Sequence, residues 1–162
     1  MNEYSEEKKD NNIEILEFIL SGENSSQTYA IKVQYIDEVH LVKKVTMLPC
    51  TPTFIVGIIN FRGKVISVID IRNFLGFSTT RMSSDKVSKV IVVGIDELEI
   101  GIAIDSILRY NKISLCELQK DILNMMNFKT HHFKGITKEQ SIVLDIKNIL
   151  RDEKIIIDEE VI

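Results

Sequence analysis

Few side chains in the sequence are suited to catalysis or metal binding, and the three histidines are the first candidates for metal binding. His131 and His132 are neighbours, and adjacent residues of a strand point to opposite faces of a sheet, so we expect the pair not to chelate one metal ion. They have no HxxxH or CxxH companion, and His40 stands alone, which is typical of surface histidines. The sequence therefore predicts no metal site.

The two cysteines form a second candidate set. Cys50 and Cys116 are far apart and lack CxxC spacing, which predicts reduced, structural thiols and neither a disulfide framework nor a zinc site. A small thiol enzyme using Cys50 is the alternative from a different functional class, but no histidine with a carboxylate supports it. Because GxGxxG and GxxxxGKS/T motifs are also missing, we expect no enzymatic activity and no cofactor.

Two aspartates could be described as paired acid–base carboxylates, but helix capping explains them more simply. Asp70 and Asp145 each precede a short apolar segment. An aspartate in this position accepts a hydrogen bond from the free amides of the next turn. We therefore predict that both are structural caps, and that Gly76 ends the turn that follows Asp70.

Arg62 is the remaining candidate, and the sequence places it at the tip of a hairpin. The runs Ile55–Ile59 and Val65–Ile69 are rich in β-branched residues and too short for buried helices, so they predict adjacent strands. Between them, Gly63 supplies the positive φ that a tight turn needs. A lone turn arginine is commonly just solvated, but a guanidinium fixed on a rigid apolar hairpin also suits recognition of a partner.

The elements around this hairpin are predicted to be mainly strands. A polar segment, Ser78–Ser88, holds many serines and threonines and predicts the connection between two halves. Ile36–Val42 fits a helical turn or a strand end, and Leu115–Met126 has helical periodicity. The other predicted strands are Ile13–Leu20, Thr28–Val33, Lys89–Ile95, Leu98–Ile104, Phe133–Ile136 and Ile142–Leu144.

The sequence also repeats itself. VIDIRNFL at 68–75 matches VLDIKNIL at 143–150 at five of eight positions. Each copy follows a phenylalanine, a basic residue and a glycine, at 61–63 and at 133–135. Because neither half alone could bury enough apolar surface, the repeat predicts two similar all-β modules packed against each other, with a boundary near 78–88.

Charge and composition exclude several functions. The net charge is −4, of which residues 1–12 contribute −2 and residues 151–162 contribute −3, so the body at 13–150 is left at +1. We expect one domain at 13–150 between a flexible acidic N-terminal tail and an acidic C-terminal tail. A body without a basic stripe does not favour nucleic acid. With no apolar run of about 20 residues and a charged beginning, the sequence predicts a cytoplasmic protein without membrane insertion.

Four blocks in this order resemble the CheW family of bacterial chemotaxis coupling proteins, over residues 13–150. They read YAIKVQYIDEV, MLPCTPTFIVGIINFRGKVISVIDIRNFLGF, VIVVGIDELEIGIAIDSI and VLDIKNIL. The specific part is the stretch from Gly57 to Gly63 with the VIDIR that follows. Two positions depart from the family pattern: Phe61 stands where leucine is common, and Cys50 where asparagine or aspartate is common.

The resemblance implies a fold and a role. The fold would be all-β with a few short helices, as two packed five-stranded β-barrels with a hydrophobic seam between them. The role would be that of a non-enzymatic adaptor joining the cytoplasmic tips of methyl-accepting chemoreceptors to the regulatory domain of the histidine kinase CheA. Such a protein is expected to be a monomer in solution and to be recruited to membrane-associated receptor arrays, with a groove between the barrels for the receptor's helical hairpin.

The resemblance also points to site residues. By position, Arg62 is the strongest candidate for partner contacts, with Gly57, Asn60 and Gly63 shaping its hairpin. Glu38, in the matching IDEV block, is the next candidate. The alternative is a scaffold of the same fold in another two-component signalling array. A CheV-like protein would need an attached receiver domain, for which 162 residues leave no room.

Overall fold

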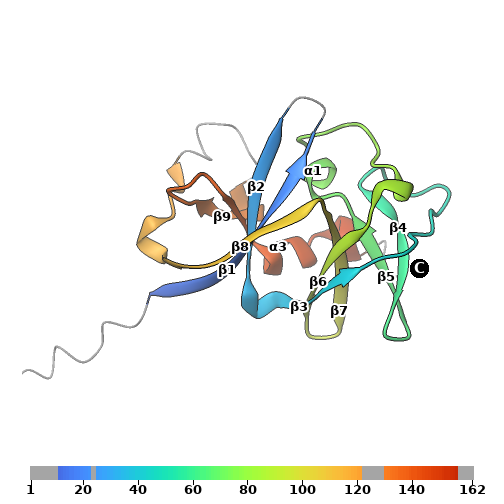
Figure 1. Ribbon diagram of the computed structural model, residues 1–162, viewed down its shortest axis with the longest axis horizontal. Helices are drawn as coiled ribbons and strands as arrows, with labels where there is room; N and C mark the ends of the chain where they lie inside the picture. Colours follow the sequence, from blue (N-terminus) through green and yellow to red (C-terminus); the bar gives the residue numbers. More distant parts are fainter. Residues whose placement is uncertain (1–10, 23–24, 122–129, 157–162) are drawn as a thin grey trace, which may run out of the picture.

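Two five-stranded sheets make up the protein, seen in a computed structural model that describes residues 11–22, 25–121 and 130–156 (Figure 1). The first sheet has the strand order β8-β1-β2-β10-β9 and draws its strands from both ends of the chain. Its strands are β1 Asn12–Ser21, β2 Ser26–Lys32, β8 Ser106–Ser114, β9 Phe133–Ile136 and β10 Ile142–Leu144.

The second sheet is formed by the middle of the chain, in the order β3-β6-β7-β5-β4. Its strands are β3 Ile36–Leu41, β4 Ile55–Phe61, β5 Lys64–Ile69, β6 Lys89–Ile95 and β7 Leu98–Ile104. The predicted strand pair around Arg62 is confirmed as β4 and β5, and the ambiguous segment after residue 35 is the strand β3.

The helices are short and follow or connect strands. They are α1 Ile71–Phe74, α3 Ile146–Leu150 and the 3-10 turns η2 Val33–Tyr35, η3 Ser84–Lys86, η4 Leu115–Glu117 and η5 Thr130–His132. None of the helices in the described segments is long and apolar enough to cross a bilayer. The predicted all-β class with a few short helices is therefore confirmed. The two predicted five-stranded barrels are two five-stranded sheets that are not closed, because the edge strands of each sheet, β8 and β9 or β3 and β4, are not paired with each other.

Apolar side chains pack in three layers. A central cluster contains residues of both sheets together with α1 and α3, and Figure 1 shows α3 between the sheets. Each sheet also has a smaller cluster of its own. Within β6, Ile91 and Val93 belong to the central cluster, while Val90 and Val92 belong to the cluster of the second sheet. Adjacent strand residues point to opposite faces, which explains why this strand is apolar throughout.

Strand order shows how the two sequence repeats are arranged. Along the chain, one repeat runs from β1 to α1 and the other from β6 to α3. In space they exchange hairpins: β1 and β2 join β8, β9 and β10, whereas β6 and β7 join β3, β4 and β5. The joins are equivalent, because β2 is parallel to β10 and β7 is parallel to β5.

The predicted module boundary near 78–88 is therefore wrong as a boundary in space. This segment leads from α1 to β6, and the strands on either side of it, β5 and β6, belong to the same sheet. It separates the repeats only along the chain. The physical reason is that a sheet is defined by pairing between strands that can be distant in sequence, which a local change in composition does not reveal.

Three predictions at the ends and in the second half need correction. The predicted tail at 151–162 is partly folded, since residues 153–156 are helical and Ile155 is 2% exposed in the central cluster. The predicted helix Leu115–Met126 is not continuous, since its first residues form η4 and Gln119 pairs with Ile136; Asp121 is helical, and residues 122–126 lie outside the described segments. Of the predicted tail at 1–12, residues 1–10 also lie outside them, and β1 begins at Asn12.

Candidate functional site

The turn between β4 and β5 consists of two residues, Arg62 and Gly63. Both have positive φ, 51° and 82°, the signs that a type I′ hairpin turn requires. Asn60 supports the turn, because its Oδ1 accepts a hydrogen bond from the amide of Gly63 at 3.1 Å. The positive φ of Gly63 is confirmed, whereas the strained conformation of Arg62 was not predicted and fixes the direction in which its side chain leaves the hairpin.

Arg62 is anchored on one side and open to solvent on the other. Its Nη2 lies 3.1 Å from Oε2 of Glu38, and its Cζ lies 5.0 Å from the centre of the Phe61 ring. The Arg62 side chain is nevertheless 67% exposed and that of Glu38 is 35% exposed. A guanidinium forms five donor hydrogens in a fixed fork, so this arrangement leaves donors available to another molecule. Two residues singled out separately in the sequence are thus brought together.

His40 and Phe61 complete this cluster, and we call Glu38, His40, Phe61 and Arg62 the hairpin site. The His40 and Phe61 rings meet edge to face with centroids 5.4 Å apart. His40 Nδ1 also lies 3.9 Å from Oε1 of Glu38. Because Glu38 and His40 come from β3 and the other two from the β4–β5 hairpin, these contacts join opposite edges of the sheet. The sheet is therefore curled, although its edge strands β3 and β4 are not hydrogen-bonded to each other as neighbouring strands.

Gly57 shapes the hairpin from inside. A Cβ at this position would lie 2.4 Å from the backbone oxygen of Thr46. Thr46 pairs with Ile58 through two backbone hydrogen bonds of 2.9 and 2.8 Å. The glycine thus permits the chain beyond β3 to close against β4, and Gly57 itself is buried.

Further charged side chains surround the hairpin site, and the sequence reasoning missed them. Lys64 Nζ lies 2.8 Å from Oε1 of Glu99, which raises the pKa of Lys64. The interaction between the carboxyl groups of Asp37 and Glu99 raises the pKa of Asp37 and lowers that of Glu99. These three residues come from β5, β3 and β7, so only the sheet order, and no sequence motif, brings them together.

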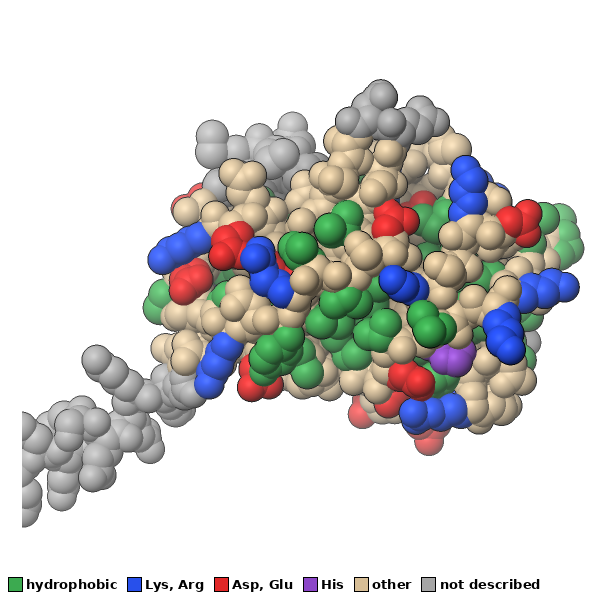
Figure 2. Space-filling view, viewed as in Figure 1, with side chains coloured by type: hydrophobic (Ala, Val, Ile, Leu, Met, Phe, Trp, Pro, Cys, Tyr) green, Lys and Arg blue, Asp and Glu red, His purple; other side chains and the backbone are tan. Residues whose placement is uncertain are grey.

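Exposed apolar side chains lie on the edge strands of both sheets. On β3, Leu41 is 72% exposed and Val39 is also exposed, and Val65 and Met47 add to the apolar surface near the second sheet. The corresponding edge strand of the first sheet, β8, exposes Ile107, Leu108 and Tyr110. On the face of the molecule that Figure 2 shows, hydrophobic side chains gather where β8, β6 and β3 lie in Figure 1, with charged groups around them. Such edges are typical of protein interaction surfaces.

Asp70 and Asp145 are caps, as predicted, and are not part of the hairpin site. Asp70 Oδ1 accepts a hydrogen bond from the amide of Arg72 at 3.1 Å, and Asp145 Oδ1 accepts one from the amide of Asn148 at 3.0 Å. Gly76, with a φ of 85°, follows α1 as expected. Burial raises the pKa of Asp70, and amide hydrogen bonds from Asn73 and Arg72 act in the opposite direction.

The predictions for the histidines and cysteines need revision. His131 and His132 lie in η5 rather than in a strand, and their ring centroids are 4.0 Å apart instead of on opposite faces. His132 is also only 5% exposed, so it is not a surface histidine. Cys50 and Cys116 are free and exposed, so neither belongs to the core as a structural thiol would.

Comparison with known proteins covers the same part of the chain. Residues 14–154 match the family model described as the CheW-like domain. The chemotaxis protein CheW of Thermotoga maritima is 31% identical over 137 residues, 83% of this chain and 87% of that protein. The chemotaxis protein CheW of Klebsiella aerogenes is 26% identical over 144 residues, 87% of this chain and 83% of that protein. The crystal structure of the scaffolding protein TtCheW from Thermoanaerobacter tengcongensis superposes with a TM-score of 0.65 at 26% identity, over 82% of this chain and 88% of that chain.

Proposed function

The chain belongs to the CheW-like domain family, and we propose that it is a non-enzymatic adaptor that couples chemoreceptors to the histidine kinase CheA. The observation that carries the proposal is the exposed guanidinium of Arg62, held by Glu38 at a rigid hairpin tip. The names of the similar proteins, chemotaxis protein CheW and scaffolding protein TtCheW, support it.

The mechanism would be geometric rather than chemical. An apolar ridge of a receptor's helical hairpin would pack against exposed apolar side chains such as Val39 and Leu41. Arg62, at the margin, would pair with a carboxylate of the partner and so fix the register of docking. Glu38 would hold the guanidinium in place before the partner arrives, which reduces the entropy lost on binding.

The assembly would depend on many modest contacts. Exposed charges and small apolar edges give weak individual interfaces, and repetition in an array adds them up. We propose that the protein is a cytoplasmic monomer in dilute solution and becomes part of a membrane-associated array through its receptors and the regulatory domain of CheA.

Calorimetric titration with the regulatory domain of the organism's own CheA tests the proposal. We expect saturable binding, followed by kinase activation when receptor tips are added. No binding well above micromolar concentrations, by protein shown to be folded, would contradict the CheA assignment. That result would favour the alternative, a scaffold of the same fold in another two-component signalling array.

A further inference from the structure

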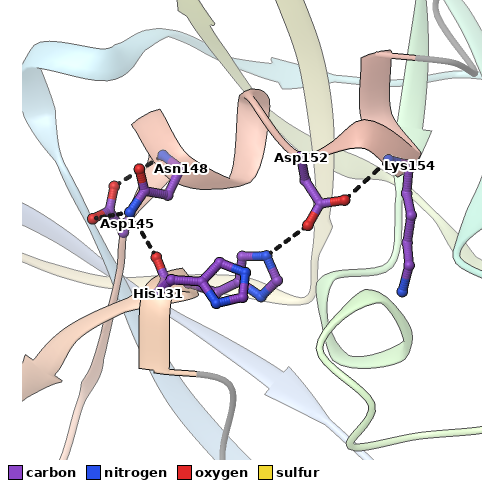
Figure 3. A network of polar contacts seen from close by, with 6 residues as sticks. His131, Asp145, Asn148, Asp152 and Lys154 are labelled. Carbon is purple, nitrogen blue, oxygen red and sulfur yellow. Dashed lines mark hydrogen bonds and ion pairs between the residues drawn. The ribbon is translucent and has the colours of Figure 1, made fainter.

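A second cluster of polar side chains lies outside the hairpin site, where η5 meets the end of α3 (Figure 3). It consists of His131, His132 and Asp152, whose nitrogen and carboxylate ligand atoms all lie within 4.8 Å of one another. His132 Nε2 is 2.8 Å from Oδ2 of Asp152. None of these three residues belongs to the hairpin site.

The backbone holds both histidines against α3. The carbonyl oxygen of His131 accepts a hydrogen bond from Asn148 Nδ2 at 2.9 Å, and that of His132 accepts one from the amide of Asp145 at 2.8 Å. Asn148 is itself fixed by the cap, because its own amide donates to Asp145 Oδ1 at 3.0 Å. Figure 3 shows this arrangement around the first turn of α3. The histidine pair is therefore positioned by the same residues that start the helix.

Asp152 approaches from the other end of α3. Its Oδ1 accepts a hydrogen bond from the amide of Lys154 at 3.0 Å, which leaves Oδ2 directed at His132. Partial burial acts to raise the pKa of Asp152, but the hydrogen bonds from the Lys154 amide and from His132 outweigh it and lower the pKa. All three potential ligands are thus tied to one short helix or to the residues directly after it.

We propose that His131, His132 and Asp152 form a binding site for a divalent transition-metal ion such as Zn²⁺. Two imidazole nitrogens and one carboxylate oxygen are a ligand set that zinc and its neighbours accept. With bonds of roughly 2.0–2.1 Å, tetrahedral ligands stand about 3.3 Å apart. The His132–Asp152 pair has to open slightly, and the exposed His131 has to swing inward. Any proton on the coordinating nitrogens is released to solvent as the ion binds.

The site has three protein ligands, so it keeps a coordination position open. His131 is exposed, and the open position would therefore face water. The ion would fasten η5 to the chain just after α3. Since Ile155 of that chain segment is buried in the central cluster, binding would also stabilise the docking of residues 153–156.

Titration of untagged protein with Co²⁺, followed by visible absorption, tests the proposal. The parent protein for all variants carries Cys50→Ser and Cys116→Ser, because free thiols also bind such ions. We expect one equivalent of Co²⁺ to bind and Zn²⁺ to displace it. Replacing a residue that only supports a metal ligand already weakens metal binding about tenfold or more. His131→Ala removes a ligand itself, so it should weaken Co²⁺ binding at least about tenfold. His40→Ala, the matched control, should bind as the parent does.

Thermal unfolding provides a second readout. Zn²⁺ should raise the Tm of the parent and of His40→Ala, because an ion that binds only the folded state stabilises it. The rise in Tm at the same Zn²⁺ concentration should be clearly smaller for His131→Ala. Because His131 is exposed, we expect this variant to fold, and its Tm without metal checks that it does. Absence of saturable Co²⁺ binding, or equal binding by the parent and by His131→Ala, would overturn the proposal.

Discussion

At the tip of the β4–β5 hairpin, Arg62 adopts a backbone conformation that residues with a Cβ seldom adopt. Its φ of 51° costs about 1 kcal/mol, whereas Gly63 beside it pays no such penalty. The exposed ion pair between Arg62 and Glu38 stabilises the folded state by at most about the same amount. Stability alone therefore does not favour arginine here, which is consistent with a role for its guanidinium in recognition.

Replacement of Arg62 by asparagine separates stability from recognition. Asparagine tolerates the left-handed region and precedes glycine in typical type I′ turns. We expect Arg62→Asn to unfold at the same or a slightly higher urea concentration, with a gain of up to about 1 kcal/mol, while coupling to receptors weakens. A clear loss of stability in urea titration would instead assign Arg62 a structural role.

Among the elements, those with local signals were predictable. The hairpin at β4 and β5 and the cap at Asp70 follow from β-branched runs, a turn glycine and a capping aspartate within a few residues. The pairing of Asp37 with Glu99 was not predictable, because it depends on which strands become neighbours. The histidine pair was misjudged because η5 replaces a strand there, and a tight 3-10 turn places adjacent rings together.

The helix caps should contribute measurably to stability. Asp70→Ala removes the side chain that accepts the Arg72 amide, and we expect it to cost about 1 kcal/mol. Asp145→Ala, which removes the equivalent cap of α3, should cost a similar amount. Urea unfolding measures both losses, and unchanged midpoints would exclude a capping role. Retained receptor coupling in folded Asp70→Ala would support capping over recognition.

The pH dependence of stability should reflect the buried Asp70 carboxyl. Burial raises its pKa above the ordinary value of 3.8 in the folded chain. The folded state then binds a proton over a range where the unfolded state has lost it, so stability falls as pH rises from about 3.8 through the raised pKa. Asp70→Asn, which can still cap but cannot titrate, should lack this decline. Urea midpoints measured across that range would show parallel curves if the carboxyl contributed nothing.

At the scale of the whole molecule, the exchanged hairpins make the two sheets interdependent. Each sheet contains strands from both sequence repeats, and one central cluster joins them. The internal repeat could be predicted from VIDIRNFL and VLDIKNIL, but the exchange could not. The parallel pairs β2 with β10 and β7 with β5 join segments far apart in the chain.

This interdependence predicts a single cooperative unfolding transition. Circular dichroism and tyrosine fluorescence should give coincident urea curves, because neither sheet is complete without strands from the other repeat. A fragment ending at residue 88 should fail to fold, since it lacks β6 and β7 of the second sheet. Two separate transitions, or a folded fragment, would show that the repeats are independent units.

The most direct test of the adaptor role is receptor-dependent activation of CheA in a reconstituted mixture with Arg62→Glu. Lys138→Glu is the matched control, because Lys138 is exposed between β9 and β10, the equivalents of β4 and β5 in the other sheet. We predict that Arg62→Glu, shown to be folded by its unfolding curve, loses most of the activation, and that Lys138→Glu retains it. Full activation by Arg62→Glu would contradict the claim that the hairpin site contacts the partner.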